Sequence, residues 1–253
     1  MYIDIHAHLD FDSFDSDREK LVKELEMKKI LTFTNTLSFE NYLKTKEMFS
    51  GVDCVKVCPG LYPQEAESIS EKEFEDYLKY LKKHKSEFLA IGEVGVDFKH
   101  TKDKGLQNVQ VERFKKIANL AYELDKPLII HSRKAEREVL EILEEFISKT
   151  KFSKFVLHCF SGKKKLIKKI KELKLYVSIP LLIQNTESFR ILVEELPVNQ
   201  ILVETDSPFL KPGRERNTPL SVPLIYEEIA KIKGLDNTEI KNIIFRNYQR
   251  LTL

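Results

Sequence analysis

Short apolar runs alternate with longer amphipathic, Lys/Glu-rich segments along the whole chain, and this alternation constrains the fold more than any other feature. We expect eight strands, over residues 2–5, 30–35, 54–58, 88–91, 128–130, 155–157, 175–178 and 201–203. Helices are expected between and after them, over residues 16–29, 39–49, 70–85, 106–125, 134–148, 163–174, 187–196, 222–233 and 238–250. Strands that alternate with helices pair in parallel through right-handed crossovers.

Eight strand–helix units predict a closed α/β barrel, the (β/α)8 or TIM barrel. An open doubly wound sheet is the competing arrangement, because it alternates strands and helices in the same way. That arrangement gives no reason for the pattern to end at eight strands, so we favour the barrel. The 253 residues, 42% of them apolar, supply a core for one unit of this size. No linker or repeat divides the chain, and we expect residues 1–253 to form a single domain.

Charge and cysteine content limit the class of protein further. The chain has 42 Lys and Arg against 40 Asp and Glu, a formal net charge of +2, so any contact with a nucleic acid must be local. Cys54 and Cys58 would lie roughly 13 Å apart on a strand at ~3.3 Å per residue, too far for a disulfide. An odd count of cysteines, with Cys159 the third, indicates a reducing compartment. With a core strand rather than a signal peptide at the start, and no run near the ~20 apolar residues of a membrane span, we expect a cytoplasmic protein and no membrane partner.

Metal-binding residue types follow five of the predicted strands directly. Parallel strands of a barrel all point the same way, so these side chains should meet at its carboxyl-terminal mouth, where barrel active sites lie. His6 and His8, two positions apart, should share one face of their strand about 6.6 Å apart and converge on one ion. The full set is His6, His8, Glu93, His131, His158 and Asp206.

Each of these residues also has an ordinary structural explanation. A single histidine at a strand end is usually hydrogen-bonded, Glu93 could cap a loop, and Asp206 could begin a turn before Ser207-Pro208. Those explanations do not account for six such residues at the same end of five strands, where an unpaired cluster would be costly to bury. Six ligands exceed one tetrahedral site and suit two divalent ions that share a carboxylate. Imidazole ligands favour Zn, Mn or Fe, whereas Mg prefers oxygen ligands. Because the set contains both imidazoles and carboxylates, the sequence does not choose among Zn, Mn, Mg and Fe.

Three further carboxylates lie close to the predicted ligands. Asp4 shares the inward face of His6, Glu204 precedes Asp206 by two positions, and Asp97 follows Glu93. These carboxylates could orient the ligands through hydrogen bonds or could have only a structural role in the core, and the sequence favours neither interpretation. His84 and His100 lie in Lys-rich stretches and receive no role.

The segments around these residues resemble, in order, the motifs of the TatD family of metal-dependent deoxyribonucleases. Each motif alone is weak, but five in order are highly specific, and the resemblance covers essentially the whole chain. The segments are Ile5-His6-Ala7-His8-Leu9-Asp10, Ile91-Gly92-Glu93-Val94-Gly95-Val96-Asp97, His131-Ser132-Arg133, His158-Cys159-Phe160-Ser161-Gly162 and Glu204-Thr205-Asp206-Ser207-Pro208, followed by Arg216-Asn217-Thr218-Pro219.

The resemblance implies a divalent-metal-dependent hydrolase that cleaves DNA phosphodiester bonds, with a 3′-to-5′ exodeoxyribonuclease acting on single strands or strand ends as the leading expectation. It also implies a role for each ligand: His6 and His8 on one ion, His131 and His158 on the second, Glu93 bridging the two, and Asp206 completing the first site and acting as general base. Arg133 would face the scissile phosphate. From charge and position, Lys163 and Arg214 or Arg216 are further candidates for contacting the substrate.

Two positions depart from the family pattern. Tyr62, in Gly60-Leu61-Tyr62-Pro63, stands where a histidine is frequent, and Ile117 stands where a glutamine is expected seven positions beyond Gln110. The Tyr62 change bears on substrate preference near that loop. Two alternatives therefore stay open: an amide or ester hydrolase of the same barrel superfamily, including an aminoacyl-tRNA deacylase, and a catalytically silent binding protein. Many such amide and ester hydrolases carry a carboxylated lysine where Glu93 stands, and a silent protein would be expected to have lost a ligand.

Overall fold

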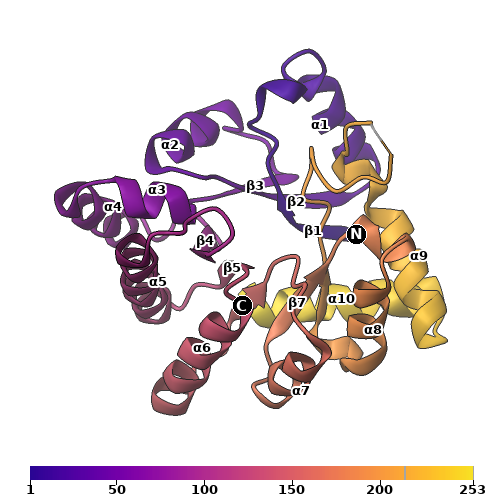
Figure 1. The fold of residues 1–253 in the computed structure, drawn as a ribbon. Coiled ribbons are helices and arrows are strands. Elements are labelled where there is room, and N and C mark those ends of the chain that lie inside the picture. The colour runs from indigo at the N-terminus through magenta and orange to yellow at the C-terminus, as the bar shows by residue number, and fades with distance from the viewer. Residues whose placement is uncertain (214, 253) are drawn as a thin grey trace.

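The computed structural model describes residues 1–213 and 215–252, and its centre is a ring of parallel strands. Figure 1 shows the strands in the middle of the molecule with the helices around them. The strands are β1 (Tyr2–Ala7), β2 (Ile30–Asn35), β3 (Val55–Cys58), β4 (Ile91–Asp97), β5 (Leu128–Arg133), β6 (Phe155–Leu157), β7 (Tyr176–Ile179) and β8 (Ile201–Val203).

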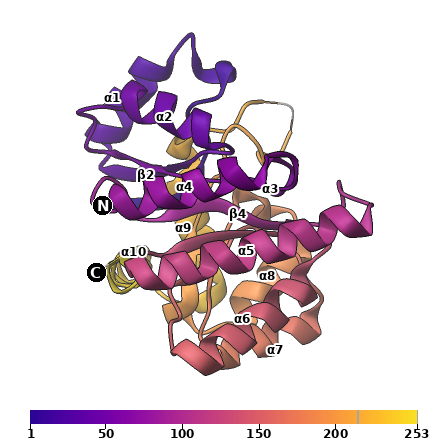
Figure 2. The ribbon, with the colours of Figure 1, turned by 90° about the vertical axis from the view of Figure 1, so that its left-hand side faces the viewer.

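Helices follow the strands and cover the outside of this ring, and Figure 2 shows several of them lying side by side. They are α1 (Arg18–Met27), α2 (Phe39–Met48), α3 (Pro63–Ser68), α4 (Glu71–Lys83), α5 (Lys104–Leu124), α6 (Glu136–Thr150), α7 (Lys164–Glu172), α8 (Glu187–Glu195), α9 (Val222–Lys233) and α10 (Asn237–Thr252). No helix within the described ranges is long and apolar enough to cross a membrane.

Regular pairing divides the ring into two sheets, β1-β2-β3 and β4-β5-β6-β7-β8. Irregular backbone hydrogen bonds join them at both seams. Between β3 and β4, the amide of Leu61 donates to the carbonyl of Glu93 at 2.9 Å. Between β8 and β1, the amide of Asp206 donates to the carbonyl of His6 at 2.9 Å, and that of His8 to Ser207 at 2.7 Å. The predicted (β/α)8 barrel is therefore confirmed, and His6, Glu93 and Asp206 lie at its two seams.

Successive side chains of β1 point alternately into two different packing environments. Ile3 and Ile5 belong to the main apolar core, while Asp4 and His6 point to polar partners and are equally buried. At the opposite end of the barrel, α10 closes the bottom. The side-chain amide of Asn247 donates to the backbone carbonyl of Ile201, at the start of β8, at 2.8 Å.

The structure corrects several predicted details. The strand expected over residues 88–91 instead begins at Ile91 and runs to Asp97, so Glu93 lies inside it rather than after it. The short helix α3 had no counterpart in the prediction. Ser38 and Ser70 cap α2 and α4, with a complete capping box at Ser70. Asn237 is the first residue of α10, and the side chain of Asp236 before it accepts from the backbone amide of Glu239.

Candidate metal centre

His6 and His8 project from β1 to the same point at the barrel mouth. Their Nε2 atoms lie 3.2 Å apart, and Asp206, on the loop after β8, places Oδ1 3.4 Å from each of them. The three ligand atoms are thus within reach of one ion, and they form a group that could hold a metal. Both histidines are buried, because alternate residues of an inner strand face the barrel interior.

Glu93 on β4 stands between two pairs of histidines. Its Oε2 lies 3.7 Å from Nε2 of His6 and of His8, while its Oε1 lies 2.7 Å from Nδ1 of His131 and 3.7 Å from Nε2 of His158. One oxygen of a single carboxylate therefore faces each pair. Such a carboxylate is placed to link two ions.

His158 is oriented by a carboxylate behind it. Its Nδ1 donates to Oε2 of Glu204 at 2.8 Å, which leaves Nε2 on the side of Glu93. The hydroxyl of Ser178 donates to the same Glu204 oxygen and fixes the carboxylate. His158, His6 and Glu93 make up a second group that could hold a metal.

His131 lies farther from the first group. Its Nδ1 faces Glu93, and its Nε2 lies 3.0 Å from Oδ2 of Asp97, a fully buried carboxylate. His131 belongs to neither of the compact ligand groups of the described residues. Its ring centroid is 6.2 Å from that of His158, so the pairing of these two on one ion remains a prediction.

Backbone and polar groups position the remaining ligands. Nδ1 of His8 donates to the backbone carbonyl of Asn35 at 2.7 Å, which leaves its Nε2 for the shared point. Asp4 accepts hydrogen bonds from the amide and hydroxyl of Thr205, next to Asp206, at 2.9 and 2.6 Å. Asp4 thereby ties β1 to the segment that carries Asp206.

The ionisation of the site is set by burial and by these contacts. Burial, followed by the stacked His158, lowers the pKa of His6 to about 4. Burial opposes the charged form of Glu93, but the hydrogen bond and charge of His131 outweigh it and lower the pKa to about 2. Hydrogen bonds from His6 and His8 likewise overcome burial and hold the pKa of Asp206 well below its usual range. Burial opposes protonation of His158, but Glu204 outweighs it and raises the pKa of His158 to about 10.

The donor set fits divalent cations. Glu93 and Asp206 are anionic at neutral pH, and protonated histidines balance their charge in the structure. Cations at the same place would supply that balance and leave the imidazoles as ligands. Four imidazoles and two carboxylates match the preferences of Zn, Mn or Fe.

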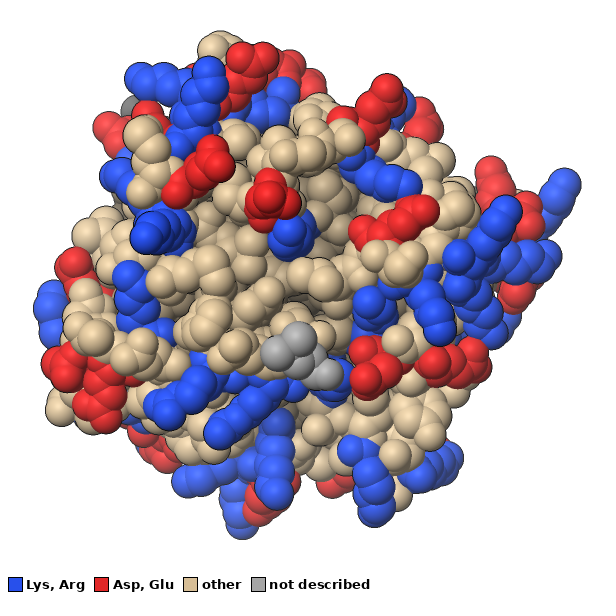
Figure 3. All heavy atoms as spheres, turned by 180° about the vertical axis from the view of Figure 1, so that it is seen from behind, with Lys and Arg blue, Asp and Glu red and all other residues tan. Residues whose placement is uncertain are grey.

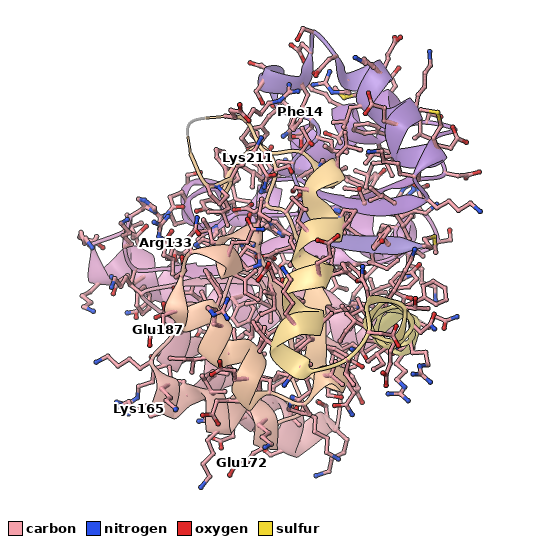
Figure 4. The ribbon with its side chains drawn as sticks, turned by 90° about the vertical axis from the view of Figure 1, so that its right-hand side faces the viewer. Phe14, Arg133, Lys165, Glu172, Glu187 and Lys211 are labelled. Carbon is pink, nitrogen blue, oxygen red and sulfur yellow. The ribbon has the colours of Figure 1, made fainter. Side chains whose placement is uncertain are left out.

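A cavity of about 700 Å³ opens over these residues. It is lined by both polar and apolar side chains: His8, Phe11, Leu37, Tyr62, Glu93, His131, Ser132, Arg133, His158, Cys159, Ser161, Leu182, Phe189, Asp206, Phe209 and Leu210. Arg133, the last residue of β5, is exposed at its edge. Figure 4 shows Arg133 and Lys211 on the same side of the molecule.

Arg216 does not line this cavity. Its guanidinium makes two hydrogen bonds to the carboxylate of Asp17, at 2.9 and 2.5 Å, and lies 4.4 Å from the ring centroid of Phe14. The structure thus gives it a contact between the loop after β8 and the start of α1. Arg214 lies outside the described residues, and Lys163 precedes α7 without lining the cavity.

Several positions at the site had no sequence signal or were misjudged. The carbonyl of Asn35 is a backbone group, which any residue would supply. His100, to which no role was given, places Nδ1 2.7 Å from Oδ2 of Asp97. Tyr62, the departure from the family pattern, places its ring 4.9 Å from that of His131 and its hydroxyl 3.4 Å from Asp97. Ile117 is buried in the core, away from the cavity lining.

A barrel whose mouth gathers four histidines and two carboxylates defines the class of metal-dependent hydrolases. The chain matches the TatD related DNase family over residues 3–252 and belongs to it. The family membership inferred from the sequence motifs is therefore confirmed, and the protein is a metal-dependent hydrolase of the TatD family.

Individual relatives agree with this assignment. An uncharacterized metal-dependent hydrolase of Methanocaldococcus jannaschii is 32% identical over 247 residues, covering 97% of this chain and 94% of its own. The human deoxyribonuclease TATDN3 is 29% identical over 260 residues, covering 98% and 93%. Among solved structures, the TatD homolog YjjV of Escherichia coli K12 superposes with a TM-score of 0.87 at 21% identity, covering 99% of this chain and 97% of that one, which shows the shared fold.

Proposed function

We propose that this protein hydrolyses the phosphodiester backbone of DNA with two divalent ions, removing nucleotides from the 3′ end of a strand. The observation that carries the proposal is the position of Glu93, which turns one oxygen to the His6–His8 pair and the other toward His131 and His158. A carboxylate placed in this way can bridge two ions, and a pair of ions stabilises both the attacking and the leaving oxygen of a displacement at phosphorus. The name of the human relative, deoxyribonuclease, supports DNA as the substrate.

The ions would polarise the scissile phosphate and favour ionisation of a water molecule. The protein's own groups supply the rest. Asp206 accepts the proton of the attacking water, because its carboxylate is anionic and lies at the His6–His8 point. The water oxygen bonds to phosphorus, the bond from phosphorus to the 3′ oxygen of the preceding nucleotide breaks, and that oxygen takes up a proton.

Arg133 would hold the phosphate from the cavity edge. A guanidinium offers paired N–H donors that match two phosphate oxygens. Among the described residues, Arg133 makes no ion pair with a carboxylate, whereas Arg216 is bound to Asp17. We therefore assign the substrate contact to Arg133 first.

A product analysis tests this function and its rivals together. Purified protein is incubated with single-stranded DNA labelled at the 5′ or the 3′ end, over a panel of Zn, Mn, Mg and Fe, and products are identified by mass. We expect 5′-mononucleotides and a 5′-labelled ladder that shortens from the 3′ end. Internal fragments would contradict exonuclease action. DNA left intact with every metal, together with hydrolysis of a lactone, an amide or aminoacyl-tRNA, would replace the proposal with the amide or ester hydrolase.

A further inference from the structure

Phe209 is a large apolar side chain that is exposed to solvent close to Asp206, the proposed general base. Its exposed fraction is 49%, three residues beyond Asp206, and it lines the cavity. The amide of Phe209 donates to the carbonyl of Asp206 at 2.7 Å, so a tight turn fixes the distance between the two side chains. Among the described residues, Phe209 belongs to neither of the buried apolar clusters.

A second aromatic residue supports Phe209 from the loop after β1. Phe11, three residues beyond His8, packs edge-on against Phe209, with ring centroids 5.6 Å apart and an interplanar angle of 86°. The His8 ring lies 5.2 Å from Phe11 and 6.2 Å from Phe209. The loops after β1 and after β8 thus each supply one ring beside the first ligand group, and Phe11 contacts Phe209 while much of Phe209 stays exposed.

We propose that Phe209, supported by Phe11, is the surface on which the terminal nucleobase of the DNA strand stacks during cleavage. The inference rests on the function proposed above and names the feature of the nucleotide that the site recognises. The nucleobase is separated from the scissile phosphate by only one sugar. With that phosphate at the ligands, the base comes next to Phe209, whose ring centroid is only 6.2 Å from that of His8. Every base has a π-face, so stacking recognises a nucleotide without selecting its sequence.

The near-neutral charge of the molecule favours such an uncharged contact with the substrate. A net charge of +2 gives little general attraction for DNA, and the cavity edge offers few cations. Stacking of one base on an aromatic side chain strengthens binding by roughly 5- to 150-fold, as judged by its loss on alanine substitution. A single ring therefore compensates for a short row of phosphate contacts.

A fluorescence experiment tests the stack without relying on turnover. The natural sequence contains no tryptophan, so Phe209→Trp introduces the only one. The metal-loaded variant is titrated with single-stranded DNA whose last linkages are phosphorothioates, ending either in a normal nucleotide or in an abasic residue. We expect the indole emission to be quenched by the normal end and to change little with the abasic end. Tyr122→Trp is the matched control, because Tyr122 is 44% exposed near the end of α5, outside the cavity lining.

Cleavage kinetics give a second, independent readout. Phe209→Ala should lower kcat/KM for a normal 3′ end by at least about fivefold, and Phe209→Tyr should restore most of it. With an abasic 3′ end, native protein and Phe209→Ala should differ by less than about twofold, because no base remains to stack.

Two outcomes would overturn the inference while DNA cleavage by the native protein still stands. One is an equal loss of kcat/KM on normal and abasic ends in the Phe209→Ala protein. The other is equal quenching of the Phe209→Trp and Tyr122→Trp proteins by both kinds of end. A native protein that cleaves no DNA with any metal would instead remove the proposed function itself.

Discussion

Each imidazole at the site except His6 is held through its second ring nitrogen by a specific acceptor. His8 uses the carbonyl of Asn35, His158 uses Glu204, and His131 uses Asp97. Such contacts fix the ring orientation and the tautomer, so the nitrogen aimed at the metal point is ready to bind. His6 is held by packing instead, with its ring stacked 3.7 Å from that of His158.

Substitutions of the two neighbouring carboxylates, Asp206 and Glu204, should lower kcat by clearly different amounts. Asp206→Asn keeps the shape of the side chain but loses the charge that binds metal and accepts the proton, so kcat should fall at least ~10²-fold. Glu204→Gln still offers an oxygen to His158, and we expect a smaller loss, roughly tenfold. Steady-state cleavage of a single-stranded oligonucleotide at saturating metal measures both. Equal losses, or an active Asp206→Asn protein, would disprove the assignment of roles.

The gathering of the candidate ligands at the barrel mouth was predictable because their types and their positions after apolar runs both appear in the sequence. Their supporting contacts were less so. Asn35 acts through its backbone, which carries no sequence signal, and His100 meets Asp97 only because a loop after β4 turns back. Arg216 shows the converse, since its position beside a motif suggested a substrate contact while its side chain pairs with Asp17.

At the scale of elements, strand periodicity predicted the barrel but misplaced β4. The apolar residues at 88–90 precede the strand, which runs from Ile91 to Asp97 with an irregular register between Ile91 and Val94, where Glu93 lies. Polar residues inside a fully buried strand conceal its extent, because they interrupt the apolar run that marks a strand. Glu93, a candidate ligand, thus lies where the local apolar pattern and the strand pairing disagree.

The seam between β3 and β4 depends on a glycine. A Cβ on Gly60 would lie 1.7 Å from the carbonyl oxygen of Thr36 and 2.5 Å from the amide nitrogen of Glu93, so the backbones could not approach. Gly60→Ala should therefore destabilise the fold by about 1–3 kcal/mol and displace Glu93, lowering metal content and activity. Denaturant unfolding and metal analysis measure these effects.

Gly105→Ala is the control for that substitution. The atom nearest to the added Cβ would be Oδ1 of Asp103 at 3.0 Å, the side-chain oxygen that caps α5 by accepting from the amide of Leu106, and no backbone atom lies as close. Alanine in a helix should leave stability unchanged or raise it by up to about 1 kcal/mol. A Gly60→Ala protein as stable and as active as the Gly105→Ala protein would contradict the close approach at the seam.

For the whole molecule, near-neutral charge sets how substrate binds. Figure 3 shows Lys and Arg interspersed with Asp and Glu on the face seen from behind. With a net charge of +2, no broad field gathers DNA, and binding must depend on a few groups at the mouth. Affinity should therefore depend only modestly on salt.

Salt dependence gives this idea a number. If about two or three phosphates of a single strand are neutralised, the log–log slope of affinity against salt is roughly −1.4 to −2.1, and a fourfold rise in salt weakens binding about 7- to 18-fold. Arg133→Ala should flatten the slope by about 0.7 and lower kcat/KM. Arg137→Ala removes another exposed charge, on α6 and already paired with Glu141, and should leave the slope unchanged. A native slope near −6, or one that Arg133→Ala does not alter, would place the phosphate contacts on another surface.

The most direct test of the central claim is a titration of metal-free protein with metal while DNA cleavage and thermal stability are both recorded. Chelation, with metal content confirmed near zero, should abolish cleavage and lower Tm, because the ligands then lose the cations that relieve their mutual repulsion. Returning metal to about 100 times its Kd should restore cleavage and raise the free energy of unfolding by about 2.7 kcal/mol. Activity should saturate at two ions per chain. Full cleavage of DNA at zero metal content, with Tm unchanged by added metal, would contradict the account.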